Sequence, residues 1–176
     1  MPLSKRQLRS LKPTLGQLDD PKESPSAYAE RVQRTLPNFP ESVITQWFRD
    51  HHQVIQQHAG LDYSSLHFEL ASFGRRELSL PCLSEHPTVV QYRDYFLQGV
   101  ESRKMARIAE YVAQNDTWPV APLIFDNPDG RFVASLGLSY SQPYDLLEGH
   151  HRMAVLYALG KHQQGFHEVW LVQRKV

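Results

Sequence analysis

Apolar positions in the second half of the chain follow two different periodicities. Between residues 88 and 114 they recur at three- and four-residue steps, which predicts two helices divided around Gly99. Near-continuous apolar runs at 118–125 and 144–147 predict two short buried strands. This stretch therefore changes from a helical to a strand pattern along its length.

The C-terminal end continues the alternation. A helix is expected from His150 to Leu159, ended by Gly160, with a final strand at 168–173. Phe132 and Val133, after a turn, are candidates for a returning edge strand. The last third of the chain thus reads strand, strand, helix, strand.

The first half of the chain is less regular. Residues 1–26 mix basic side chains with prolines and a glycine, which predicts a flexible N-terminal arm. Helical spacing of four leucines leaves open a short amphipathic segment that docks on the body or on a partner. Those leucines are Leu8, Leu11, Leu15 and Leu18.

After this arm, one helix is expected from Glu41 to about Gly60, where apolar side chains again recur at helical steps. Alternation over 66–72 predicts a strand, and Leu78 with Leu80 suggests a second one before a proline. Together these elements predict an α/β (α+β) fold, a small mixed sheet flanked by helices. We expect a single domain over 27–176, with its core at about 80–176.

Charge and cysteine content narrow the function classes. Lys plus Arg and Asp plus Glu both number 19, so attraction to a polyanion requires a local patch, and non-specific DNA binding is not expected. Sequence-specific DNA binding is not expected either. Cys82 is the single cysteine, which excludes an internal disulfide and a CxxC pair. No apolar run approaches the length of a membrane span. We expect a cytoplasmic protein without a membrane partner.

The first turn of the C-terminal helix departs from the usual charge preference. A helix N-terminus exposes unpaired N–H groups and partial positive charge, which disfavours cations. Here the chain places His150, His151 and Arg152 in that turn, directly after Gly149. These donors and the free amides predict a phosphate site. Because glycine has no side chain, the phosphate can approach the backbone closely. An exposed first turn with Gly149 as an ordinary N-cap is the alternative.

Glu148 precedes this turn at the exit of a predicted strand. A carboxylate repels phosphate unless a metal bridges the two or a proton is moved. Glu148 is therefore a candidate Mg²⁺ ligand or general base, with His151 as its catalytic neighbour.

The run Leu146-Leu147-Glu148-Gly149-His150-His151-Arg152, followed by the apolar helix, resembles the ParB/sulfiredoxin superfamily. Partition-type members carry Gly-Glu-Arg-Arg here, sulfiredoxins Gly-Cys-His-Arg, and the free serine kinase branch Asp-Gly-His-His-Arg. The kinase branch is the nearest of the three. His150 stands at the position of the sulfiredoxin cysteine, so sulfinic acid repair is not implied. The resemblance covers about residues 100–176.

This resemblance implies a ParB/sulfiredoxin-like fold that binds ATP or another nucleoside triphosphate with Mg²⁺. It implies phosphoryl transfer or nucleotide hydrolysis. The alternative is a non-catalytic module that binds a nucleotide or nucleic-acid phosphate. Such a module would act through a protein partner recruited by the N-terminal arm. By position, further phosphate contacts fall on the helix before the first buried strand. These are Ser102, Arg103 and Lys104, with Arg107 one turn later.

Overall fold

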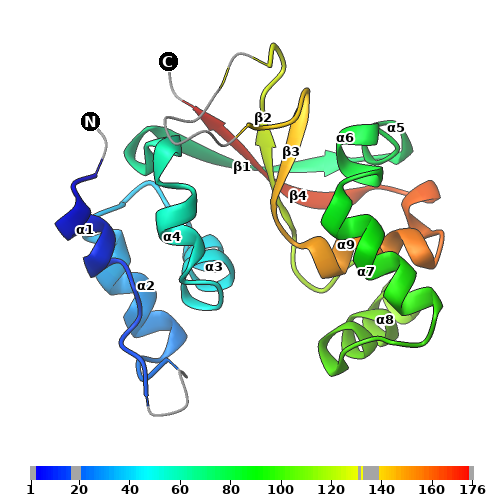
Figure 1. The fold of residues 1–176 in the computed structure, drawn as a ribbon, viewed down its shortest axis with the longest axis horizontal. Coiled ribbons are helices and arrows are strands. Elements are labelled where there is room, and N and C mark those ends of the chain that lie inside the picture. The colour runs from blue at the N-terminus through cyan, green and yellow to red at the C-terminus, as the bar shows by residue number, and fades with distance from the viewer. Residues whose placement is uncertain (1–2, 17–20, 131, 133–138, 175–176) are drawn as a thin grey trace. The chain divides into compact units, whose positions relative to one another are not determined.

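The computed structural model describes residues 3–16, 21–130, 132 and 139–174. The chain divides into two compact units, unit 1 built mainly from residues 3–68 and unit 2 from residues 69–132 and 139–171. Four strands form one sheet in the order β1-β4-β2-β3 (Figure 1). The strands are β1 (Leu66–Phe73), β2 (Leu123–Asp126), β3 (Tyr144–Glu148) and β4 (His167–Arg174). The α+β class is therefore confirmed.

Unit 1 is helical. Its α-helices are α1 (Lys5–Ser10), α2 (Pro25–Gln33), α3 (Glu41–Val43) and α4 (Val54–Gln57). A π-helix, η1 (Ile44–Arg49), and two 3₁₀ turns, η2 (Ala59–Leu61) and η3 (Tyr63–Ser65), complete it. Aromatic rings fill its core, with Phe39 stacked on Trp47 at 6.3 Å between centroids and Tyr63 edge-on to Phe48 at 5.0 Å.

The prediction of one helix from Glu41 to about Gly60 is wrong. A π-turn replaces the regular helix from Ile44, marked by the amide of Asp50, which donates to the carbonyl of Thr45 at 3.1 Å. The wider turn buries Trp47 and Phe48 completely in the same aromatic core, although they are adjacent in sequence. Residues 50–53 then form a turn before α4 begins.

The N-terminal segment contains a helix, α1, and a contact with α2. Ser4 caps α1, and Leu11 just after it is 1% exposed. The hydroxyl of Tyr28 on α2 donates to the carbonyl of Leu11 at 2.6 Å, and Arg31 donates to the carbonyl of Lys12 at 3.0 Å. Of the four leucines in the amphipathic interpretation, Leu8 belongs to α1 and Leu11 is buried, whereas Leu15 lies beyond α1 and Leu18 is outside the described residues.

Unit 2 places three longer helices around one core. Its helices are α5 (Arg75–Leu78), α6 (Pro81–Ser84), α7 (Pro87–Leu97), α8 (Arg103–Asn115), α9 (His150–Ala158) and the 3₁₀ turn η4 (Lys161–Gln163). Helix α9 packs against both α7 and α8 (Figure 1). Met153, Leu156 and Val155 of α9 are fully buried, together with Ile124 of β2. The apolar stripe of α9 therefore forms the centre of this core.

Most predicted elements of unit 2 are confirmed. The buried strand expected over 118–125 is shorter, because β2 begins at Leu123 and Val120 is 42% exposed. Gly99, at φ +72°, separates α7 from α8, and β2 and β3 pair antiparallel. Leu78 and Leu80 do not form a second strand: Leu78 ends α5 and Leu80 precedes α6, which Pro81 opens. The possible edge strand at Phe132 and Val133 falls largely outside the described residues, and Phe132 itself is not in a strand.

Trp118 joins the segment before β2 to the start of β4. Its indole N–H donates to the carbonyl of Glu168 at 2.7 Å, and its ring lies 5.2 Å from that of His167. His167 in turn contacts the Thr117 hydroxyl at 3.0 Å. Trp118 is thus a core residue, 5% exposed, immediately before Pro119.

Candidate functional site

Helix α8 presents a basic face because its apolar face is buried. Ser102 caps it, its hydroxyl accepting a hydrogen bond from the amide of Met105 at 3.3 Å. Met105, Ile108 and Val112 are buried at the helical spacing of one face. The cations at its start consequently lie outside the core.

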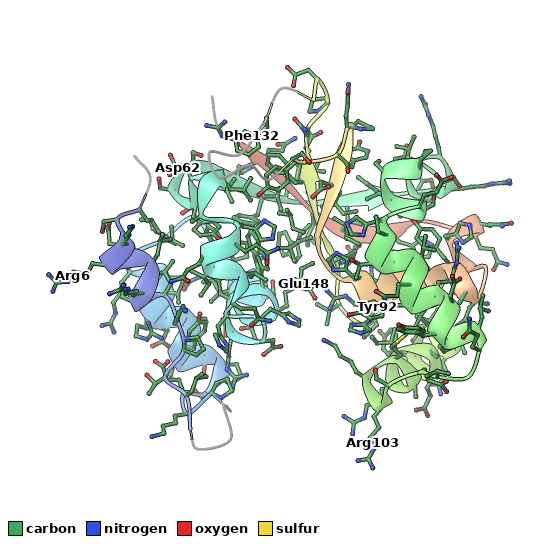
Figure 2. The ribbon with its side chains drawn as sticks, in the orientation of Figure 1. Arg6, Asp62, Tyr92, Arg103, Phe132 and Glu148 are labelled. Carbon is green, nitrogen blue, oxygen red and sulfur yellow. The ribbon has the colours of Figure 1, made fainter. Side chains whose placement is uncertain are left out.

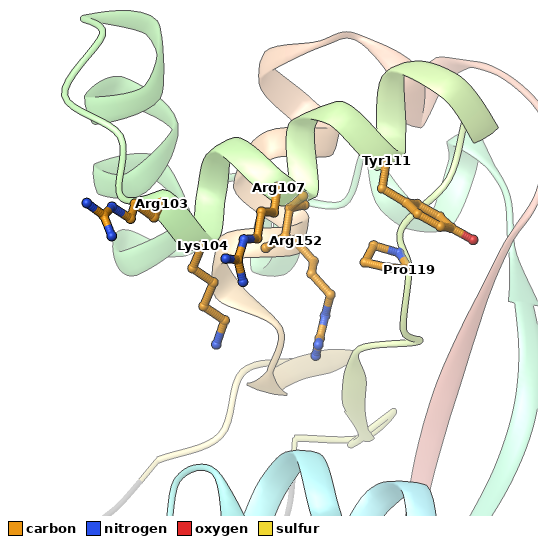
Figure 3. A pocket seen from close by; sticks show the side chains of 7 residues that line it. Arg103, Lys104, Arg107, Tyr111, Pro119 and Arg152 are labelled. Carbon is orange, nitrogen blue, oxygen red and sulfur yellow. The ribbon is translucent and has the colours of Figure 1, made fainter. Parts of the chain in front are cut away.

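A cavity of about 520 Å³ lies beside this face. Its volume is in the range of small-molecule sites. Its lining comes from α8, from the segment before β2 and from the first turn of α9 (Figure 3). The lining residues are Arg103, Lys104, Arg107, Ile108, Tyr111, Pro119 and Arg152.

Three of the four cations that line the cavity extend to the same side. Figure 3 shows Lys104, Arg107 and Arg152 extending together, whereas Arg103 extends away from them. Arg103 also points outward in the wider view of Figure 2. Of the described residues that line the cavity, none is acidic. The cavity therefore concentrates positive charge, and Arg103 is the cation least directed into it.

The entry into α9 requires glycine for a steric reason. Gly149, at φ +107°, lies in a region that side-chain-bearing residues rarely adopt. A Cβ at this position would lie 2.5 Å from Cβ of Pro122 and 3.2 Å from Nη2 of Arg152. The amide of Met153 donates to the carbonyl of Gly149 at 2.9 Å and so begins the helix. Close packing on Pro122, rather than ligand approach alone, accounts for this glycine.

Arg152 forms an ion pair with Glu148, one helical turn earlier in sequence. Both residues are nearly buried, with 8% of Arg152 and 9% of Glu148 exposed. A carboxylate at the end of β3 thus holds the guanidinium that lines the cavity. The structure thus places Glu148, which the sequence suggests as a Mg²⁺ ligand or general base, in direct contact with Arg152.

His150 and His151 lie against the α6–α7 region and are not among the residues that line the cavity. The ring of His151 stacks on Tyr92 of α7, 4.1 Å between centroids, and His150 lies 4.9 Å from the ring of His86. Burial lowers the pKa of His86 below its usual 6.5. The structure therefore brings Arg152 together with the α8 cations but places the two histidines beside another helix.

Sequence reasoning missed the uncharged lining of the cavity. Tyr111 follows Arg107 by four residues and Lys104 by seven, so all three share one face of α8. That spacing is the sequence signal that places Tyr111 on the same face of α8 as the two cations. Pro119 belongs to the segment expected to be a strand and carried no such signal. Ser102, predicted as a phosphate contact, instead caps the helix and does not line the cavity.

Acidic and metal-ligating side chains are sparse around the site. In the described part of the chain, no three His, Cys, Asp or Glu residues gather closely enough to hold a metal ion. Glu148 therefore offers a single carboxylate. Within the same described ranges, no helix combines the length and apolarity needed to cross a membrane.

The arrangement can hold an anion next to a flat apolar surface. Arg152, Lys104 and Arg107 supply charged donors, and the opposite end of the lining is uncharged. No protein-family model, no curated protein and no solved structure matches this chain.

Proposed function

We propose that the chain binds a phosphate-bearing ligand, a nucleotide, in the cavity between α8 and the first turn of α9. The observation that carries this proposal is the convergence of cations from two helices on one cavity without an acidic lining residue among those described. Like charges gathered in one place repel each other, and an anion bound among them converts that repulsion into attraction.

The two helix N-termini strengthen the electrostatic argument. Neither α8 nor α9 has an acidic residue in its first turn. Each instead carries basic residues there, Arg103 and Lys104 on α8 and Arg152 on α9. A cation in that position costs about 0.3–1 kcal/mol against the helix dipole. A phosphate bound in the cavity would offset that cost at Lys104 and would add to the charge that Glu148 supplies at Arg152.

Membership of the ParB/sulfiredoxin superfamily is part of the proposal. Two features support it: β3 runs through Gly149 directly into α9, and basic residues of the preceding helix line the same cavity as Arg152. Both features are those that the motif's resemblance leads one to expect.

Binding without turnover is the form of the function that the geometry favours. The Glu148 carboxylate is engaged by Arg152, and His151 is stacked on Tyr92. A general base needs its carboxylate directed at the proton that it removes. In this arrangement Glu148 instead fixes the orientation of the phosphate-binding arginine.

Mg²⁺-dependent phosphoryl transfer or hydrolysis is the second candidate. This candidate is supported by the contact of Glu148 with Arg152, the arginine that would bind the proposed phosphate. Mg²⁺ is commonly held by one or two carboxylates together with substrate phosphates, and Glu148 with a nucleotide would provide that donor set. The ion would neutralise phosphate charge, and the ion pair would have to open to admit it.

Calorimetric titration of the full chain tests the proposal. We expect ATP or another nucleoside triphosphate to bind, with an affinity that falls as salt rises because the contacts are ionic. Arg107→Ala should weaken binding about tenfold or more, the value of a charge-assisted hydrogen bond. Arg76→Ala, an exposed cation on α5 outside the cavity, is the matched control and should change nothing. Equal affinity in wild type and Arg107→Ala would contradict the proposed site.

The two candidate functions are separated by turnover. Purified protein with Mg²⁺ and the bound nucleotide should release no phosphate if it is a binding module. Release that disappears in Glu148→Gln, while nucleotide affinity is kept, would establish the catalytic form instead.

A further inference from the structure

The cavity has an uncharged end that the phosphate contacts do not use. It is formed by Ile108, Tyr111 and Pro119. Ile108 is 7% exposed and belongs to the core of unit 2, whereas Tyr111 is 39% exposed. The phenol ring of Tyr111 therefore does not contribute to the buried core, and its apolar surface is accessible from the cavity.

The distance between the two ends follows from helix geometry. Lys104 and Tyr111 are seven residues apart on α8, which corresponds to about 10 Å along the helix axis. Arg107 lies between them on the same face. Figure 3 shows Tyr111 and Pro119 on one side of Arg152 and the other cations on its opposite side. A ligand in this cavity thus meets positive charge at one end and a ring surface at the other.

We propose that Tyr111, with Pro119, forms the wall on which the base of a bound nucleotide stacks, and that Tyr111 thereby selects nucleotides over inorganic polyphosphates. This inference rests on the proposed function and assigns the orientation of the ligand within the same cavity. The phosphates face Lys104, Arg107 and Arg152, and the base lies toward Tyr111.

The chemistry of the two ends favours a nucleoside phosphate over other phosphorylated ligands. A base is planar and apolar on its faces, and stacking on an aromatic side chain contributes about 1–3 kcal/mol per base. An inorganic polyphosphate has no group that gains from contact with Tyr111 or Pro119. A sugar phosphate carries hydroxyl groups, which would lose hydrogen bonds with water against this uncharged surface.

The test compares one ligand that has a base with one that has none. Dissociation constants for ATP and for inorganic tripolyphosphate are measured by calorimetry in wild type, Tyr111→Ala and Tyr111→Phe. Stacking predicts that Tyr111→Ala weakens ATP binding about tenfold and leaves tripolyphosphate binding unchanged. Tyr111→Phe, which keeps the ring, should bind both ligands as wild type does.

A matched control comes from α7. Tyr95 is 41% exposed, close to the value of Tyr111, and does not line the cavity. Tyr95→Ala should leave both dissociation constants unchanged. Thermal unfolding of each variant without ligand shows whether the substituted chains remain folded.

The outcomes separate this inference from the function on which it rests. If Tyr111→Ala weakens ATP and tripolyphosphate equally, or neither, the stacking wall is wrong while phosphate binding stands. If wild type binds tripolyphosphate as tightly as ATP, Tyr111 does not select nucleotides. If wild type binds neither ligand, the proposed function itself fails and the inference falls with it.

Discussion

The imidazole of His151 stacks on the ring of Tyr92, with 4.1 Å between centroids and 16° between planes. This contact separates His151 from Arg152, its neighbour in sequence. Arg152 lines the cavity, whereas His151 packs on α7. Two residues that the sequence alone treats as one basic cluster thus have different surroundings and should respond differently to substitution.

We expect Arg152→Lys to weaken nucleotide binding much more than His151→Gln. Lysine keeps the charge but loses the planar fork, which contacts Glu148 and in the proposed site would also contact a phosphate. The loss should be about tenfold, whereas His151→Gln should change the dissociation constant less than about threefold. Calorimetric titration with ATP measures both. A larger loss for His151→Gln would place the phosphate on the α7 side of the turn.

Glu148→Gln should lower stability but increase the stabilisation that the ligand provides. Removing one partner of a nearly buried ion pair leaves the charge of Arg152 uncompensated, which typically costs about 3–5 kcal/mol. A bound phosphate supplies the missing negative charge. The rise in melting temperature on adding ATP should therefore be larger in the variant than in wild type.

Glu148→Gln with Arg152→Gln in the same chain is the control for that experiment. With both charges removed, the melting temperature should recover relative to Glu148→Gln, and the ligand-induced rise should become smaller than that of wild type, because Lys104 and Arg107 still line the cavity. If the ligand-induced rise in melting temperature is smaller in Glu148→Gln than in wild type, Glu148 takes part in binding the ligand.

Gly149→Ala should be strongly destabilising. It combines an unfavourable positive φ, about 1–2 kcal/mol, with a Cβ placed 2.5 Å from Cβ of Pro122, for a total of about 2–5 kcal/mol. Urea unfolding measures the change. Gly160→Ala, at φ +68° with no atom within 4 Å of its Cβ, is the matched control and should cost only the backbone strain. Equal losses in the two variants would show that Pro122 yields to the new methyl group.

Stability should fall as the pH decreases from about 7 to 5. Burial lowers the pKa of His86, His162 and His167 below the usual 6.5, because the buried ring loses hydration when it is charged. The folded state therefore binds fewer protons than the unfolded state in this window. Its stability is fully present above about pH 6.5 and is lost as the pH falls through the folded-state pKa values.

Urea midpoints at pH 7.5, 6.5 and 5.5 test this dependence. His167→Gln should reduce the pH slope, since His167 is 1% exposed and contacts the Thr117 hydroxyl and the Lys161 carbonyl. His52→Gln, whose ring is on a turn of unit 1, serves as the control. A midpoint that rises toward pH 5.5 would contradict the assigned direction.

The sequence predicted the elements of unit 2 well because their signals are local. Gly99 divides two amphipathic helices, and Gly160, at φ +68°, ends α9. The π-turn from Ile44 could not be predicted in this way, since helical periodicity does not distinguish a regular turn from a wider one. It depends on how Trp47 and Phe48 pack with rings distant in sequence.

The site was predicted in part for a similar reason. The unusual place of Arg152 at a helix N-terminus predicts its part in the site, and the resemblance predicts that of the α8 cations. Successive residues on a helix point about 100° apart, so His150, His151 and Arg152 cannot all face one ligand. Tyr111 lies outside the motif, and its place in the lining depends on how α8 packs against α9.

The indole of Trp118 lies beside the titratable ring of His167 and next to the wall of the cavity. Its ring is 5.2 Å from His167, and the next residue, Pro119, lines the cavity. A protonated imidazole beside an excited indole quenches its emission, and a change in the cavity wall alters the surroundings of that ring. The chain also contains Trp47 and Trp170. The difference between the intrinsic fluorescence of wild type and that of Trp118→Phe should therefore report, without any label, both proton uptake by His167 and binding of the proposed ligand.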